Sequence, residues 1–280
     1  VEFIEQNKEK PFFLYVAHWD VHSPIRARKE VVAKYKKKLE TFTDDGDWEW
    51  NPIYAAMIDA VDTSVGRLRA KIKQAGLEDN TLFIFTSDNG GASFATTNRP
   101  LRGAKGAFFE GGIRVPTCAA WPAVIKAGSR SDAALTSVDF MPTFAEMTGA
   151  SLPTNQPVDG RSFTKVLQGK ADLQNRAIFW HYPLYLSGSG YNKVLPVYGT
   201  DKLNWRTVPC SVIRKGEYKL IHYYEYDDYK LFNLRDDLSE KNDLARKMPQ
   251  KAKQLDAELM AWVKNTKAPV PTKPNPKFIN

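Results

Sequence analysis

The chain has 280 residues, of which 42% are hydrophobic and 12% aromatic, enough apolar material for one large domain with a smaller appendage. No segment approaches the ~20 consecutive apolar residues of a membrane helix, and the first residues do not resemble a signal sequence. The net charge of +8 suits an anionic partner, but no nucleic-acid-binding motif accompanies the scattered Lys and Arg residues. We therefore expect no membrane span and no nucleic-acid partner.

Strands and helices are predicted to alternate in the first part of the chain. The continuous apolar run 11–17 predicts a parallel strand covered on both faces. Asn51 is a good N-cap for the helix that follows, whose apolar residues recur at helical spacing until Gly76. A second buried strand is expected over 81–86. This order predicts a right-handed crossover in an α/β sheet.

The α/β pattern continues to about residue 170 with a third strand over 115–121 and a helix over 139–147. Beyond that point, short predicted strands separated by turn residues indicate an antiparallel meander. An amphipathic helix is expected to pack on this sheet. The strands are expected at 210–213, 218–224 and 230–234, and the helix at 249–264. We therefore expect two domains, 1–174 and 175–280.

Asp88 and Asn89 directly follow the second predicted strand. Ligands of open α/β sheets collect at the carboxyl ends of strands. A carboxylate beside a carboxamide offers hard oxygen donors, which suit Ca²⁺ or Mg²⁺. The alternative is an ordinary tight turn, because Asp, Asn and Gly are also the residues that turns prefer.

A basic loop and a histidine complete the candidate residues. Lys105 lies between Gly103 and Gly106, which would let backbone approach a ligand, and its compact ammonium suits an oxyanion. Arg102 is close enough in sequence to meet the same anion. His22 follows the first predicted strand and could give a proton to an ester oxygen. Each of these residues could also belong to an ordinary surface loop or have a structural role.

The order of these motifs resembles that of the type I sulfatases. A long apolar strand ending in His22-Ser23-Pro24 is followed by the segment 86–91 (TSDNGG), and then by 101–106 (LRGAKG) and 110–116 (EGGIRVP). Each motif is weak by itself, whereas the ordered set is specific. The resemblance implies an alkaline-phosphatase-like α/β fold, in which helices sandwich a mixed sheet and a smaller C-terminal α+β subdomain is built on an antiparallel sheet.

Carried over by position, the resemblance implies that Asp88 and Asn89 bind Ca²⁺, with Mg²⁺ less favoured, and that Lys105 and His22 contact the sulfate group. The family's nucleophile is a formylglycine made from Cys or Ser in a Cys/Ser-x-Pro/Ala-x-Arg motif. Neither Cys118 nor Cys210 lies in such a motif. We therefore expect the nucleophile and the remaining metal ligands to lie outside this chain, and the chain alone to be inactive.

The implied substrate is a sulfated carbohydrate or an aryl sulfate. The segment 179–183 (FWHYP) resembles one that lines the pocket mouth in carbohydrate-acting members, so His181, like Arg102, is a candidate substrate-binding residue. His18 and His222 are interpreted as structural, and Arg114 as part of a structural ion pair. Family habit favours a secreted, periplasmic or lysosomal enzyme, and the sequence does not define the oligomeric state.

Two other functions stay open at this point. A phosphate or phosphonate ester hydrolase of the same superfamily would also use a cationic, metal-bound pocket. However, the chain has only four histidines and lacks the Asp and His cluster that two metals require. A non-catalytic protein that binds sulfated glycans is the other alternative. A Cys/Ser-x-Pro/Ala-x-Arg motif upstream would favour the sulfatase, and its absence would favour the binding protein.

Overall fold

The computed structural model shows two compact units, each described by itself. It describes residues 1–43, 50–173, 175–187, 199–200, 203–225, 227–273 and 275–276. The first unit comprises Val1–Phe85, Phe94–Thr97 and Thr117–Ala123, and the second comprises Thr86–Ser93, Asn98–Pro116 and Val124–Asn280. The expected domain boundary near residue 175 stays a prediction.

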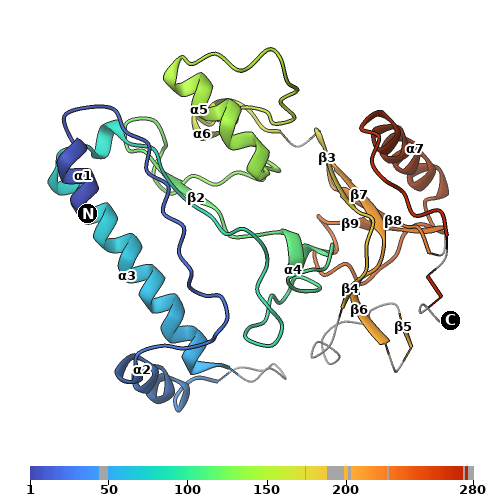
Figure 1. Cartoon of the computed structure of the whole chain (residues 1–280), viewed down its shortest axis with the longest axis horizontal. Coiled ribbons are helices and arrows are strands. Elements are labelled where there is room, and N and C mark those ends of the chain that lie inside the picture. Colours follow the sequence, from blue (N-terminus) through green and yellow to red (C-terminus); the bar gives the residue numbers. More distant parts are fainter. Residues whose placement is uncertain are drawn as a thin grey trace. The chain divides into compact units, whose positions relative to one another are not determined.

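Three helices build most of the first unit (Figure 1). They are α1 (Glu2–Asn7), α2 (Lys29–Leu39) and α3 (Pro52–Gln74). The predicted start of α3 is confirmed, because the Asn51 side chain accepts hydrogen bonds from the first backbone N–H groups of the helix. Gly76, with φ of +70°, follows its end. The short helix α1 also contacts α3, and an ion pair joins Lys34 of α2 to Asp59 of α3.

The strands of this unit differ from the prediction. β1 (Phe83–Phe85) pairs antiparallel with β2 (Cys118–Ala120), within the strands expected at 81–86 and 115–121. The strand predicted at 11–17 is wrong: in the described part of the chain this segment forms no ladder, and Phe13 and Tyr15 are 70% and 80% exposed. A buried parallel strand needs partners on both edges and cover on both faces. The described residues supply neither, so the predicted crossover is not formed here.

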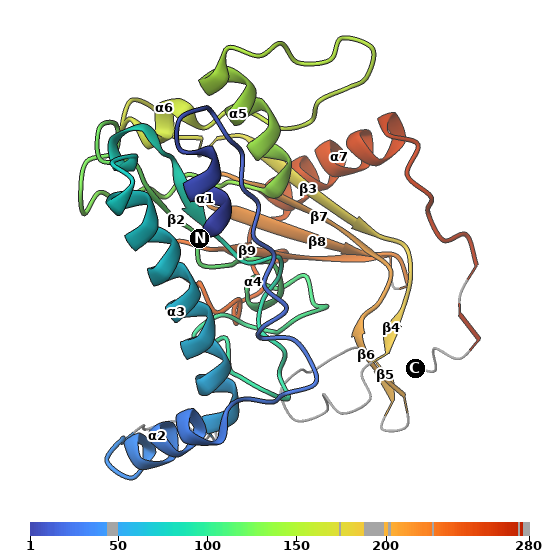
Figure 2. The same ribbon diagram turned by 60° about the vertical axis from the view of Figure 1, so that its left-hand side comes forward.

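A four-stranded antiparallel sheet is the centre of the second unit (Figure 2). Its order is β3-β7-β8-β9. The strands are β3 (Ala177–Tyr182), β7 (Cys210–Lys215), β8 (Tyr218–Tyr223) and β9 (Asp228–Asn233). The predicted meander is thus confirmed as β7-β8-β9, and β3 was not predicted. The predicted C-terminal helix is also confirmed, as α7 (Pro249–Asn265).

The two faces of this sheet have different cores, because side chains alternate along a strand. One face packs on α7 through residues such as Leu220, Leu231 and Leu259, and Phe179 stacks on Trp262 with ring centroids 4.8 Å apart. The other face includes Val212, Ile221 and Phe232, and it packs against Ala107 and Phe109. The segment 104–110 is therefore held on the face opposite α7.

Short elements complete the second unit. They are α4 (Glu110–Ile113), η2 (Ser137–Asp139), α5 (Phe140–Thr148), α6 (Thr164–Leu167), β4 (Leu186–Ser187), β5 (Gly199–Thr200) and β6 (Leu203–Thr207). The first unit also contains η1 (Glu78–Asn80). The helix predicted at 139–147 is confirmed as α5, which ends at Gly149 in the left-handed region. No helix in the described part of the chain combines the length and apolarity needed to cross a bilayer.

The packing of α7 on the sheet gives a first prediction. Leu259 has no exposed surface, so we expect Leu259→Ala to lower the free energy of unfolding by about 2–5 kcal/mol. The measurement is chemical denaturation followed by circular dichroism. The matched control is Gln254→Ala, at an exposed position of the same helix, which we expect to change stability by no more than about 0.5 kcal/mol. Equal effects of the two substitutions would contradict the assigned core.

Candidate active site

The turn after β1 presents the two predicted metal ligands. Asp88 is exposed and Asn89 is half-buried. The Ser87 hydroxyl donates to the carbonyl of Asn89 at 3.2 Å, which holds the turn through its backbone. Within the described residues, neither side chain of the pair makes a hydrogen bond or an ion pair. Their oxygen atoms are therefore available to a cation.

The structure brings this turn against the loop that carries Lys105, residues 102–112, which is called the Lys105 loop below. The Lys105 N–H donates to the carbonyl of Gly91 at 3.0 Å, and the Gly90 N–H donates to the carbonyl of Gly112 at 3.0 Å. A Cβ atom on Gly90 would lie 1.8 Å from the carbonyl oxygen of Gly111. Only glycine permits this approach of two backbones. The two sequence motifs thus form one structural element.

Asn98 joins the same two segments and was missed by the sequence analysis. Its side-chain oxygen accepts from the Gly91 N–H at 2.9 Å. Its amide group donates to the carbonyls of Gly91 at 2.9 Å and Gly103 at 3.3 Å. A carboxamide can both donate and accept, so a single residue bridges the two backbones. Its only sequence signal is a position between the two motifs.

Lys105 is half-buried, and its ammonium forms no ion pair within the described residues. Arg102, by contrast, is engaged. One of its guanidinium N–H groups donates to the carbonyl of Glu240 at 2.8 Å, and the guanidinium lies 3.9 Å from the centre of the Phe109 ring. These contacts give Arg102 a structural function in the loop, and its substrate-binding role stays a prediction.

A cluster of buried charges lies at the base of this loop. Lys219 on β8 lies 3.1 Å from a carboxylate oxygen of Glu110 and 2.9 Å from one of Glu240, and all three side chains are 1% exposed or less. The second Glu240 oxygen accepts from the Glu110 N–H at 2.6 Å. Burial raises the pKa of Glu240 above its ordinary value, although the nearby Lys219 charge lowers it. Arg114 lies 3.7 Å from Glu110, the structural ion pair expected of it.

His22 lies in the first unit and is exposed. Its Nδ1 atom is 3.1 Å from the carbonyl oxygen of Ser23, and its backbone N–H donates to the carbonyl of Trp19 at 2.9 Å. A carbonyl can only accept, so this contact is a hydrogen bond in the forms of the imidazole that carry a proton on Nδ1. His18 bonds to Ser64 at 2.8 Å, a structural contact as expected.

His181 lies on the sheet face that packs against α7, so the structure does not bring it to the Lys105 loop. Its Nδ1 atom is 2.7 Å from the Ser211 hydroxyl, and its Nε2 atom is 2.8 Å from the carbonyl oxygen of Pro269. Both ring nitrogens thus have protein partners, and the substrate-binding role of His181 stays a prediction. On the same face, His222 pairs with Asp256 at 2.8 Å, the structural role expected of it.

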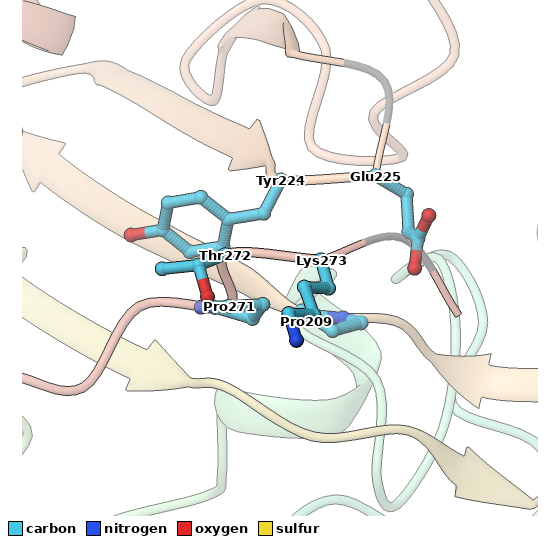
Figure 3. Close-up of a pocket in the computed structure, with 6 residues that line it drawn as sticks. All are labelled: Pro209, Tyr224, Glu225, Pro271, Thr272 and Lys273. Atoms are coloured by element: carbon cyan, nitrogen blue, oxygen red, sulfur yellow. The ribbon is translucent and has the colours of Figure 1, made fainter.

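A small pocket of about 140 Å³ lies where the segment after α7 passes Tyr224 (Figure 3). Its lining residues are Pro209, Tyr224, Glu225, Pro271, Thr272 and Lys273. None of the predicted site residues is among them. The candidate site is therefore the surface formed by the 86–91 turn and the Lys105 loop.

Comparison with known proteins decides the family. The sequence model of the sulfatase family matches residues 1–150, more than half of the chain. The chain belongs to the sulfatase family. A second model, described as the C-terminal region of N-sulphoglucosamine sulphohydrolase, matches residues 104–268.

Similar proteins include a sulfatase from Formosa agariphila, 34% identical over 93% of this chain and 48% of its own length. The human steryl-sulfatase is 30% identical over 65% of this chain and 30% of its own. The chain thus spans about half or less of the curated relatives it matches. A crystal structure of Ps i-CgsB is 28% identical with a TM-score of 0.75, covering 93% of this chain and 52% of that one. The chain has the alkaline-phosphatase-like α/β fold of these sulfatases.

The donor atoms of this site are of the chemical type that the metal implied by the sulfatase family prefers. The carboxylate of Asp88 and the carboxamide of Asn89 are hard oxygen ligands of the type that Ca²⁺ prefers. In the part of the chain that the structure describes, however, no group of three or more His, Cys, Asp or Glu side chains could hold a metal ion. Since Ca²⁺ takes about six to eight ligands, these two residues can supply only part of its coordination shell.

The two cysteines of this sulfatase chain have opposite surroundings. Cys118 is exposed on β2, whereas Cys210 is 1% exposed at the start of β7. Burial raises the pKa of the Cys210 thiol to about 12, while its contact with Thr207 lowers it. The thiolate is the reactive form of cysteine, so Cys210 is inert at neutral pH. Its role is to pack in the sheet core.

This difference gives a second prediction. With iodoacetamide at pH 8, we expect Cys118 of the folded protein to be alkylated at least a hundredfold faster than Cys210, because thiolate fraction and access control the rate. Mass spectrometry of the two tryptic peptides follows both reactions. The same reaction in denaturant is the control and should remove the difference. Fast alkylation of Cys210 in the folded protein would contradict its burial.

Proposed function

We propose that the protein hydrolyses sulfate esters, with Lys105 binding the sulfate group and with Asp88 and Asn89 among the ligands of a Ca²⁺ ion. The observation that carries this proposal is the direct contact between the 86–91 turn and the Lys105 loop. It joins the backbones of the segments that carry Asp88, Asn89 and Lys105. Within the described residues, none of these three side chains pairs with another side chain. Membership of the sulfatase family supports the same activity. The activity is proposed for the whole protein.

Lys105 is suited to bind an anion that gains charge during reaction. Its backbone is held by the bond to Gly91, and an ammonium placed against a sulfate oxygen would stabilise the negative charge that develops there. A bound Ca²⁺ ion would offset negative charge on the same sulfate group. The chain's own contribution is to join the turn of Asp88 and Asn89 to the loop of Lys105 through backbone hydrogen bonds.

His22 is proposed to help the leaving alcohol depart. Its Nδ1 atom lies against the carbonyl oxygen of Ser23, to which it can donate a hydrogen bond, and Nε2 is left for a substrate. A protonated imidazole can donate from Nε2 to the ester oxygen as the bond to sulfur breaks. This role remains a proposal, as do the contributions of Arg102 and His181 to substrate binding.

A sulfated carbohydrate is the substrate class that we favour. A structure 29% identical to this chain is of Ps i-CgsB in complex with k-i-k-neocarrahexaose. The net charge of +8 also suits a substrate that carries several anionic groups. Aryl sulfates serve as small test substrates. The family resemblance favours a secreted, periplasmic or lysosomal location for such an enzyme.

The metal assignment gives a third prediction. In the natural protein, expressed from its complete open reading frame, Asp88→Ala should remove Ca²⁺ and most sulfatase activity while it leaves the fold intact, because an exposed carboxylate contributes little to the core. Atomic emission measures calcium, and circular dichroism measures the fold. The control is Asp62→Ala, an exposed carboxylate of α3. Unchanged calcium content in the Asp88 variant would count against the assignment.

Lys105 gives a fourth prediction and the main test of the function. In the same protein, Lys105→Ala should lower kcat/KM on a small aryl sulfate by about a hundredfold or more, the effect of losing one preorganised oxyanion contact of roughly 3 kcal/mol. Lys105→Arg should not restore full activity, because a planar guanidinium is wider than an ammonium.

The control for this experiment is Lys170→Ala, an exposed lysine of the same unit. Calcium content is measured in each variant. A loss of less than about threefold with calcium retained would mean that Lys105 is an ordinary surface lysine. Wild-type protein that binds a sulfated oligosaccharide but does not cleave it would instead support the non-catalytic binding function.

A further inference from the structure

We infer that Lys219 and Glu240 are positioning residues for Lys105, because the ion-pair cluster they form with Glu110 holds the Lys105 loop in one register against the sheet. The inference rests on the proposed function of Lys105 as the sulfate-binding residue. It concerns two residues that do not belong to the 86–91 turn or to the Lys105 loop.

Glu240 binds the loop at both of its ends. Its carbonyl accepts from the guanidinium of Arg102, three residues before Lys105, at 2.8 Å. Its carboxylate accepts from the N–H of Glu110, five residues after Lys105, at 2.6 Å. The Gly111 N–H donates to the carbonyl of Arg102 at 2.7 Å and closes the loop between these points. Lys105 thus lies within a segment whose two ends are fixed to one residue.

Lys219 connects Glu240 and Glu110 to the sheet. On β8 it shares a face with Ile221 and Tyr223, the face that packs against Ala107 and Phe109. Its ammonium lies between the carboxylates of Glu110 and Glu240, at 3.1 and 2.9 Å, with no exposed surface. A buried ammonium has few acceptable positions for its partners, whereas apolar contacts tolerate sliding. The cluster therefore fixes where the loop lies on the sheet.

The same contacts keep Lys105 available to an anion. Glu110 is the acidic residue of the loop, and its carboxylate is directed to Lys219 and Arg114. Because it is engaged beneath the loop, it does not neutralise Lys105. Loss of Lys219 would remove both effects, since the loop would lose its anchor and Glu110 would lose its partner.

The fifth prediction tests this inference with a double-mutant cycle in the natural protein. We expect Lys219→Met to lower kcat/KM on an aryl sulfate about tenfold or more, because small displacements of a catalytic group have large effects on rate. In a Lys105→Ala background the same substitution should cost less than about twofold, because the residue through which it acts is gone. The matched control is Lys215→Met, at a position of the same sheet, which breaks a half-exposed ion pair with Glu258 of α7 and should leave kcat/KM unchanged.

Equal losses in both backgrounds would show a general structural effect and overturn the inference. Assays are made at a temperature at which circular dichroism shows each variant folded. If Lys219→Met does not fold, Glu240→Gln enters the same cycle, with Glu258→Gln as its control. Glu240→Gln keeps the side-chain length and the backbone carbonyl but removes one charge of the cluster. A loss confined to the background that retains Lys105 would support the inference, and equal losses in both backgrounds would overturn it.

Amide hydrogen exchange separates this inference from the proposed function. We expect Lys219→Met, but not Lys215→Met, to speed exchange in peptides covering residues 102–112 about tenfold or more, since local stability sets the exchange rate. Unchanged exchange in these peptides would overturn the inference even in an active enzyme. An inactive wild-type protein would count against the proposed function alone, and the exchange result would then decide whether the cluster holds the loop.

Discussion

The contact on which the second unit depends is the pairing of the Lys219 ammonium with two buried carboxylates. Removing an ion from water costs several kcal/mol, and only close, well-bonded partners offset that cost. Glu110 accepts a hydrogen bond from Lys219 and Glu240 forms a close ion pair with it, from segments 109 and 21 positions away in the sequence. Loss of one partner of such a cluster typically costs about 3–5 kcal/mol, because a charge is left buried without compensation. The three segments are therefore required to meet at one point, which apolar packing alone would not specify.

The two faces of the four-stranded sheet pack against different parts of the chain. One face packs α7 and contains the hydrogen bonds of His181 and His222, while the other holds the Lys105 loop. Alternation along β3 places neighbouring aromatic residues in different cores, with Phe179 on the α7 side and Trp180 on the loop side. Phe179 and Trp180 of this aromatic segment are thus part of the packing on the two faces of the sheet.

Local sequence signals predicted elements well where the cause was local. The Asn51 cap, the glycine ends of α3 and α5, and the turns of the meander all depend on residues a few positions apart. The error at 11–17 has a physical reason, since an apolar run indicates burial without identifying the strand that pairs with it. The two loop motifs were recognised, but Asn98 and the Lys219 cluster were not. Their roles exist only once distant backbones have met.

The acidic residue of the loop that carries Lys105, the proposed sulfate-binding residue, is engaged by other cations. A lysine beside an unengaged carboxylate would pair with it, and that pair would compete with an anionic ligand. Here Glu110 and Glu240 are both drawn to Lys219 beneath the loop, and Arg114 lies beside Glu110. The close backbone contacts at Gly90 and Gly112 leave no room for a side chain at either position. The buried cluster thus engages the carboxylate of Glu110, and the glycines permit the close backbone contact between the turn and the loop.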